Sequence, residues 1–197
     1  MAAFLALDLG TEGARAAVYG VDGTLMGSGA DRYPTRFPRP GWAEQDPDDW
    51  WRAGAHAVRQ ALAEAGGPSI DGIAVATTAS TVAVLDRDGR PLRPALLWMD
   101  GRAGAESELT AETGHPVLRY SGGRDAVEWL VPKAMWLARH EPATYRASPA
   151  TSSSPIPASS RRSACPGKFP EEFSTDGDES GLRRRYVRVS IRREEHP

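Results

Sequence analysis

The residues near the N-terminus have the types and spacing of a site for phosphate and a metal ion. An apolar run over residues 3–9 contains Asp8 and is followed by Gly10, Thr11 and Gly13, which predicts a strand, a tight turn and a second strand. The glycines allow a bulky anion close to the backbone, where amides and the Thr11 hydroxyl can donate to phosphate oxygens. Asp8 can hold Mg²⁺ directly or through water. The alternative is an ordinary hairpin in which these residues only make the turn.

Three short segments of mainly small or polar residues, here called breaks, follow apolar runs. They are Asp8 to Gly13, Thr77 to Ser80 and Trp98 to Arg102. Ligands of α/β sheets bind outside the carboxyl ends of strands, so the three breaks are expected to converge. The second break suits a hydroxyl-rich ligand, because its side chains are small and can donate and accept. The third offers an indole wall and the Asp100 carboxylate, an acceptor for sugar hydroxyls. The alternatives are a plain strand connection, a core Trp98, and Asp100 as the cap of the next helix.

The elements that must position these residues begin with a third antiparallel strand. The turn signal Asp22-Gly23 precedes Leu25 to Tyr33, a run that Gly27 and Gly29 weaken as a strand. We expect this strand to end in the proline-rich loop over residues 34–40.

The first predicted helix follows Asp46. Asp46 is a good N-cap, Pro47 suits the first helical position, and Gly66-Gly67 stops the helix. His56 lies off the apolar stripe and is expected at the surface. The residues expected on the core face are Trp51, Ala55, Val58, Leu62 and Ala65.

The remaining predicted elements alternate between strands and helices. They are strands over 70–76 and 81–86 with a turn at Asp88-Gly89, an apolar run over 94–100, a helix over 101–113 stopped by Gly114, and a helix over 130–139. In the last helix Pro132 is tolerable only near the start, and Trp129, Lys133 and Trp136 or Leu137 share one side. The pattern predicts an α/β fold with a mixed sheet.

Composition limits the class of protein. The chain has 197 residues, 40% of them hydrophobic, and a net charge of −2, which argues against a general nucleic-acid or anionic-membrane binder. The only cysteine is Cys165, so no intrachain disulfide is possible and a reducing, cytoplasmic setting fits. No apolar stretch approaches the roughly 20 residues of a membrane span, and no signal peptide is apparent.

The composition changes near residue 145. Residues 1–145 hold all six tryptophans and carry 14 Lys/Arg against 19 Asp/Glu, or −5, whereas residues 146–197 hold ten serines and six prolines and carry ten Lys/Arg against seven Asp/Glu, or +3. The second part cannot bury much apolar surface. We therefore predict a folded domain over 1–145 and a disordered Ser/Pro/Arg-rich tail over 146–197.

Four motifs occur together in a specific order. They are Asp8-x-Gly10-Thr11, Gly41-Trp42-Ala43-Glu44-Gln45-Asp46-Pro47, Gly72-Ile73 and Leu97-Trp98-x-Asp100-x-Arg102. The set resembles the N-terminal domain of the FGGY carbohydrate kinases over about residues 3–145. Glu128-Trp129-x-x-Pro132-Lys133-x-x-Trp136-Leu137, followed by Glu141-Pro142, is similar to the ribulokinase-like branch. Asp-x-Gly-Thr alone is shared with many sugar kinases and with actin-like and chaperone ATPases, whereas the combined set is specific.

The resemblance implies a ribonuclease-H-like (actin-like ATPase) fold in two lobes, with ATP and sugar between them. It implies that Asp8 organises Mg²⁺, and that the phosphates are lined by Gly10, Thr11, Glu12, Gly13 and Arg15. It places the sugar against Thr78, Ala79 and Ser80, with Trp98 and Asp100 beside it and Tyr120 approaching it.

The resemblance also implies a substrate class. At the positions of Ala79 and Ser80, glycerol kinases have a charged pair and xylulokinases have Met-His, so a ribulose-like ketopentose or a related polyol is expected instead. The predicted activity is ATP-dependent phosphorylation of a sugar hydroxyl in the cytoplasm. The partner is the small-molecule sugar, with no nucleic acid or membrane, and a homodimer is left open for a full-length member.

The chain also departs from the family. The resemblance places the general-base Asp beyond residue 197 and implies a second, adenosine-binding lobe that the sequence lacks. Because the family pattern stops near Tyr145, we expect a truncated or frameshifted product whose exposed apolar surface promotes aggregation. The alternative function is an inert fragment that at most binds sugar or phosphate weakly. A third class is another actin-like ATPase that hydrolyses ATP without sugar.

Overall fold

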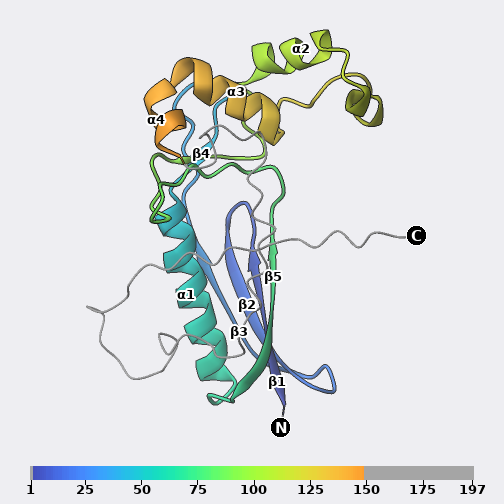
Figure 1. The fold of residues 1–197 in the computed structure, drawn as a ribbon. Coiled ribbons are helices and arrows are strands. Elements are labelled where there is room, and N and C mark those ends of the chain that lie inside the picture. The colour runs from blue at the N-terminus through green and yellow to red at the C-terminus, as the bar shows by residue number, and fades with distance from the viewer. Residues whose placement is uncertain (1, 149–197) are drawn as a thin grey trace.

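The computed structural model describes residues 2–148. Its main sheet has the strand order β3-β2-β1-β5, and Figure 1 shows these strands side by side. The strands are β1 (Ala3–Leu9), β2 (Gly13–Gly20), β3 (Leu25–Arg32) and β5 (Ile70–Thr77). β1 pairs antiparallel with β2 and parallel with β5, and β2 pairs antiparallel with β3. The mixed sheet with antiparallel strands first is therefore confirmed.

Helix α1 (Pro47–Glu64) packs on β2 and β3. Its predicted start is confirmed, because the Asp46 carboxylate accepts a hydrogen bond from the Asp48 amide at 3.0 Å and Pro47 occupies the first turn. The predicted core face is confirmed for Val58, which is buried, and in part for Leu62 and Ala65, which are partly buried and pack against the core. Trp51 and Ala55 are only partly buried. The buried stripe is formed mainly by small residues, namely Ala53, Gly54, Ala57 and Ala61.

Two glycines of β3 explain why small residues face the sheet. A Cβ atom at Gly27 would lie less than 3.0 Å from the carbonyl oxygen of Ala61, and one at Gly29 would lie equally close to that of Ala57. The helix backbone thus rests directly on the strand backbone, which larger side chains would prevent. Gly27 and Gly29 are the contact surface for α1, rather than weak points of the strand.

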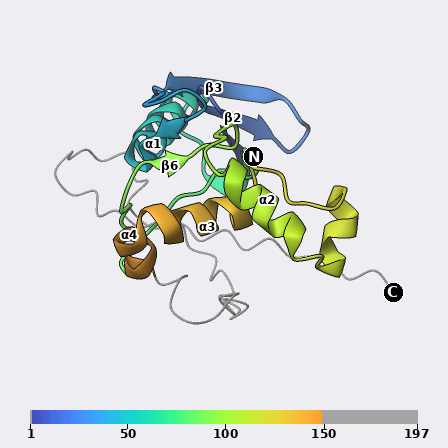
Figure 2. The ribbon, with the colours of Figure 1, turned by 90° about the horizontal axis from the view of Figure 1, so that it is seen from above.

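A second layer lies beyond the end of the sheet at which β1 and β5 finish (Figure 1). It consists of α2 (Gly104–Glu112), the 3₁₀ helix η1 (Pro116–Ser121), α3 (Leu130–His140) and α4 (Pro142–Ala147). Figure 2 shows α2 beside α3, and these two helices are in contact. A two-stranded sheet of β4 (Glu44–Gln45) and β6 (Ala95–Leu96) joins the layers. Helix α2 ends just before Gly114, which has a φ of 59°, as predicted.

Three sequence-based expectations for this region need correction. The predicted strand over 81–86 is reduced to single bridges, because the two-residue β6 offers its second edge only to Val82. The apolar run over 94–100 likewise contributes only β6 to a sheet. The apolar run over 70–76 is typical of a buried strand, but Ile73 and Val75 of β5 are exposed because β5 is the edge strand and α1 packs mainly on β2 and β3. Aggregation through this apolar edge stays a prediction.

Two other expectations concern the C-terminal tail and membrane-spanning helices. The predicted tail over 146–197 lies almost wholly outside the described residues. No helix among residues 2–148 has the length and apolar character required to cross a bilayer.

The close contact between α1 and β3 can be tested with Gly29→Ala. The added methyl group would overlap the Ala57 carbonyl, so we expect the free energy of unfolding to fall by about 1–3 kcal/mol or more. Urea unfolding followed by circular dichroism measures this change. Gly104→Ala is the control, because a Cβ there meets no atom within 4 Å. Equal stability of the two variants would contradict the proposed packing.

Candidate functional site

The predicted phosphate hairpin forms the turn between β1 and β2. Asp8 at the end of β1 faces Arg15 on β2, with 3.4 Å between its Oδ2 and the Arg15 Nη1. Both side chains are substantially exposed, at 47% and 73%, and exposed ion pairs contribute little free energy. Each group is therefore available to a ligand: the carboxylate to a cation and the guanidinium to an anion.

The carbonyl groups of this turn are held by side chains that the sequence did not identify. The Tyr33 hydroxyl donates to the Gly10 carbonyl oxygen, and the Gln45 amide donates to that of Thr11 at 2.7 Å. Trp50 Nε1 in turn donates to Gln45 Oε1 at 2.8 Å. Burial raises the pKa of Tyr33 to about 12, with a smaller contribution from Asp8, so the hydroxyl remains a donor at neutral pH. The only available signal was Gln45 inside the Gly41–Pro47 motif.

The two glycines of the hairpin have different surroundings. A Cβ at Gly13 would lie less than 3.0 Å from the Asp31 carbonyl oxygen of β3, so strand packing alone requires glycine there. A Cβ at Gly10 would make only ordinary contacts, 3.5 Å or longer. Gly10, rather than Gly13, is therefore the glycine without a packing reason, and close approach of an anion would account for it.

Trp98 joins the third break to the hairpin. Its indole Nε1 donates to Thr11 Oγ1 at 3.1 Å, and its backbone amide donates to Thr81 Oγ1 at 3.2 Å. Its exposed fraction of 42% excludes the core position considered as the alternative. Thr81 Oγ1 also lies 3.4 Å from Thr78 Oγ1, which brings the second break alongside. Ala79 is exposed beside them.

A buried lysine completes the convergence of the three breaks. Lys133 on α3 has no exposed surface, and its Nζ donates to the carbonyl oxygens of Leu97 at 2.6 Å and Ser80 at 2.9 Å. The sequence placed Lys133 on one side of its helix but gave no sign of these partners. The phosphate hairpin and both polar breaks thus lie together at one end of the sheet, as expected for segments that follow the carboxyl ends of strands.

The Asp100 carboxylate is buried and bonded to other groups of the protein in this structure. It is fully buried, its Oδ2 accepts from the Ala43 amide at 2.6 Å, and both its oxygens accept from the Arg102 guanidinium at 2.8 Å. Its predicted role as the cap of α2 is wrong, since the cap residue is Ala103 and no side chain caps that helix. Both of its carboxylate oxygens have protein partners. The predicted contact between Asp100 and a sugar stays a prediction.

Arg102 extends this cluster. Its Nη2 also bonds Glu44 Oε1 at 2.7 Å, and its guanidinium stacks on Trp42 with 3.7 Å to the ring centre. Arg93 bonds the same Glu44 oxygen. Burial lowers the pKa of Arg93, while the carboxylates of Glu141 and Glu44 oppose that change. We name these residues (Arg102, Asp100, Glu44, Arg93 and Trp42) the arginine cluster.

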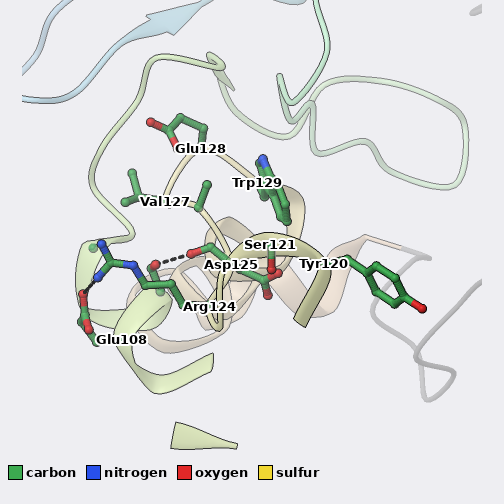
Figure 3. A pocket seen from close by; sticks show the side chains of 11 residues that line it. Glu108, Tyr120, Ser121, Arg124, Asp125, Val127, Glu128 and Trp129 are labelled. Carbon is green, nitrogen blue, oxygen red and sulfur yellow. Dashed lines mark hydrogen bonds and ion pairs between the residues drawn. The ribbon is translucent and has the colours of Figure 1, made fainter. Parts of the chain in front are cut away.

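Tyr120 is not brought to the hairpin. It lies on η1 with 77% of its surface exposed, and its hydroxyl is bonded to Arg119 at 2.6 Å. It borders a hollow of about 450 Å³ between α2, η1 and residues 125–129. Figure 3 shows its ring pointing away from the other labelled side chains, with Trp129 elsewhere on the rim. Its predicted contact with the sugar stays a prediction.

The fit of Mg²⁺ rests on Asp8. Residues 2–148 contain no group of three or more His, Cys, Asp or Glu side chains placed to hold a metal. Mg²⁺ commonly uses one or two carboxylates together with phosphate oxygens and water, so a single accessible carboxylate beside a phosphate turn is a suitable donor set. Glu12 is exposed on the same turn.

Comparisons with known proteins agree with this geometry. The family model for the FGGY family of carbohydrate kinases, N-terminal domain, matches residues 3–151. The xylulose kinase of Klebsiella pneumoniae is 30% identical over 142 residues, which are 72% of this chain and 29% of that protein. A glycerol kinase of Bordetella pertussis is 38% identical over 114 residues, 56% of this chain and 22% of that protein.

Solved structures give the same family relationship. The xylulose kinase of Rhodospirillum rubrum superimposes with a TM-score of 0.67 at 32% identity, covering 74% of this chain and 31% of that one. The chain thus spans about 30% of the length of the relatives it matches.

The structural role of Asp100 can be tested with Asp100→Asn. The neutral amide removes the carboxylate that bonds the buried Arg102 through two nitrogens and leaves it only the Glu44 carboxylate, which Arg93 shares, so we expect a loss of about 3–5 kcal/mol in the free energy of unfolding. Asp88→Asn is the matched control, because the Asp88–Arg90 pair is mostly exposed and should contribute about 0–1 kcal/mol. Chemical denaturation of both variants measures the difference, and similar values would contradict the buried role.

Proposed function

The chain belongs to the FGGY family of carbohydrate kinases, and we propose on that basis that its described residues bind ATP phosphates with Mg²⁺ on one side and a small sugar on the other. The observation that carries the proposal is the hydrogen bond between Trp98 Nε1 and Thr11 Oγ1. It places a half-exposed indole from the break assigned to the sugar against a hydroxyl from the hairpin assigned to phosphate. The two ligands would therefore meet at this point.

The hairpin is suited to phosphate because its carbonyl acceptors are bonded to side chains while its donors remain available. Tyr33 and Gln45 occupy the carbonyl oxygens of Gly10 and Thr11, which would otherwise repel an anion. The Thr11 hydroxyl and the Arg15 guanidinium can then donate to phosphate oxygens. Phosphoryl transfer depends mainly on such positioning and charge stabilisation. Bound Mg²⁺, held by Asp8, would neutralise charge on the transferred group.

The second side of the site is suited to a polyol. Thr78 and Ser80 supply short polar groups, Ala79 leaves room between them, and the Trp98 indole offers a flat apolar wall. We propose a ribulose-like ketopentose or a related polyol as the substrate. The relatives named above are xylulose and glycerol kinases, so xylulose and glycerol are the direct competitors in a test.

We assign no general base among the described residues. A sugar hydroxyl needs a positioned group to take its proton during transfer. For these residues alone we therefore propose binding, and we treat transfer as an activity of a protein with the length of the relatives. The inert fragment remains the competing proposal, and it predicts no transfer and at most weak binding of sugar or phosphate.

A substrate panel tests the proposal. We expect isothermal titration calorimetry of the 197-residue chain to detect binding of a ketopentose, with ribulose bound more tightly than xylulose or glycerol. A coupled ADP-release assay with ATP, Mg²⁺ and each sugar measures transfer separately. Sugar-dependent ADP release would extend the proposal to catalysis. Absence of binding to every sugar and to Mg²⁺–ATP would refute it in favour of the inert fragment.

The phosphate side is tested with Thr11→Val, which keeps the side-chain shape and removes the hydroxyl. The loss of one hydrogen-bond donor should weaken Mg²⁺–ATP binding by about 3–10-fold, equivalent to roughly 0.5–1.5 kcal/mol. Thr24→Val, in the turn between β2 and β3, is the control and should leave binding unchanged. Titration calorimetry measures both, and equal affinities would argue against phosphate at Thr11.

A further inference from the structure

Lys133 is a fully buried cation that bonds backbone carbonyls. Lysine is almost never completely buried unless its charge has partners, since removing an ammonium from water is costly. Its two partners here are the carbonyl oxygens of Leu97 and Ser80, at 2.6 and 2.9 Å. These bonds join α3 to two segments that lie far from it, and from one another, in the sequence.

Both partners belong to segments with unusual geometry or a direct link to the hairpin. Ser80 has φ of 64°, and it is the only non-glycine residue with positive φ among residues 2–148. Such a conformation costs of order 1–2 kcal/mol and persists where the surroundings impose it. Leu97 directly precedes Trp98, whose indole bonds Thr11. Lys133 therefore bonds the backbone of both segments that form the proposed sugar subsite.

We propose that Lys133 is a positioning residue, whose ammonium fixes the distance between the Thr78–Ser80 segment and Trp98 and so sets the shape of the sugar subsite. The inference rests on the proposed function for the identity of the ligand. The clamp itself (Lys133 Nζ with the Ser80 and Leu97 carbonyl oxygens) rests only on the contacts above. Lys133 acts through these carbonyl groups and has no assigned contact with the sugar.

The charge of Lys133 gives a second, independent signature. Burial lowers the pKa of Lys133 from 10.5 to about 8; the carboxylates of Asp100 and Glu128 oppose this shift and the Arg102 guanidinium adds to it. Lys133 is therefore less protonated in the folded chain than in the unfolded chain between pH 8 and 10.5. The contribution of Lys133 to the free energy of unfolding should rise over this range as pH increases.

The clamp is tested by hydrogen–deuterium exchange of the full chain. Lys133→Met keeps an apolar stem and removes the donors, so exchange at amides 79–81 and 97–99 should accelerate at least tenfold, while β1 to β3 change less than twofold. Lys133→Gln, which keeps a neutral donor, should restore part of the protection. Arg124→Met is the control and should change neither segment, because its ion pair with Glu108 is exposed. Unchanged exchange in Lys133→Met at both segments would overturn the clamp.

Titration of the same variants with the ketopentose that binds the wild type separates the two proposals. We expect at least a tenfold weaker affinity in Lys133→Met and an intermediate value in Lys133→Gln. Accelerated exchange with unaltered affinity would overturn the positioning role. A wild type that binds no sugar would refute the proposed function, and exchange would still decide the clamp. Should Lys133→Met fail to fold, Lys133→Gln and the pH dependence remain: a wild-type stability curve parallel to that of Lys133→Gln from pH 8 to 10 would refute the buried charge.

Discussion

The buried guanidinium of Arg102 is the interaction on which the layer beyond the sheet depends. It bonds Asp100 and Glu44 and lies against Trp42 and Trp136, so it contacts residues from separate parts of the chain. A planar guanidinium bonded through two nitrogens constrains its partners in direction as well as distance. Breaking such a buried pair leaves an uncompensated charge, which makes the arrangement difficult to alter in small steps.

The arginine cluster and the proposed ligand site share the same short segments. In β4, successive side chains point to opposite faces, so Glu44 enters the cluster while Gln45 reaches the Thr11 carbonyl of the hairpin. Asp100 enters the cluster two residues after Trp98, which bonds Thr11. A structural role for Glu44 and Asp100 therefore explains their place in the motif without direct contact with a ligand. The cluster fixes the backbone, and the neighbouring side chains face the site.

Local signals were sufficient for β1 to β3 and for the start of α1, because turn residues and capping residues such as Asp46 act on their own neighbourhood. Contacts between distant segments were not predictable in the same way. Gly27 and Gly29 looked like weak strand positions until α1 was placed on them, and the same packing decided which face of α1 is buried. The partners of Lys133 are backbone carbonyls, and any residue type can supply a carbonyl, so no sequence pattern identifies them.

The direction of the hydrogen bond between Trp98 and Thr11 follows from chemistry. An indole N–H can only donate, so Thr11 Oγ1 is the acceptor and its own proton is free to point elsewhere. A hydroxyl that accepts one hydrogen bond becomes a better donor in another, because the two bonds polarise each other. Under the proposed function, the indole therefore orients and strengthens the Thr11 donor toward a phosphate oxygen. On that proposal Trp98, which would line the sugar subsite, also orients a hydrogen-bond donor of the phosphate subsite.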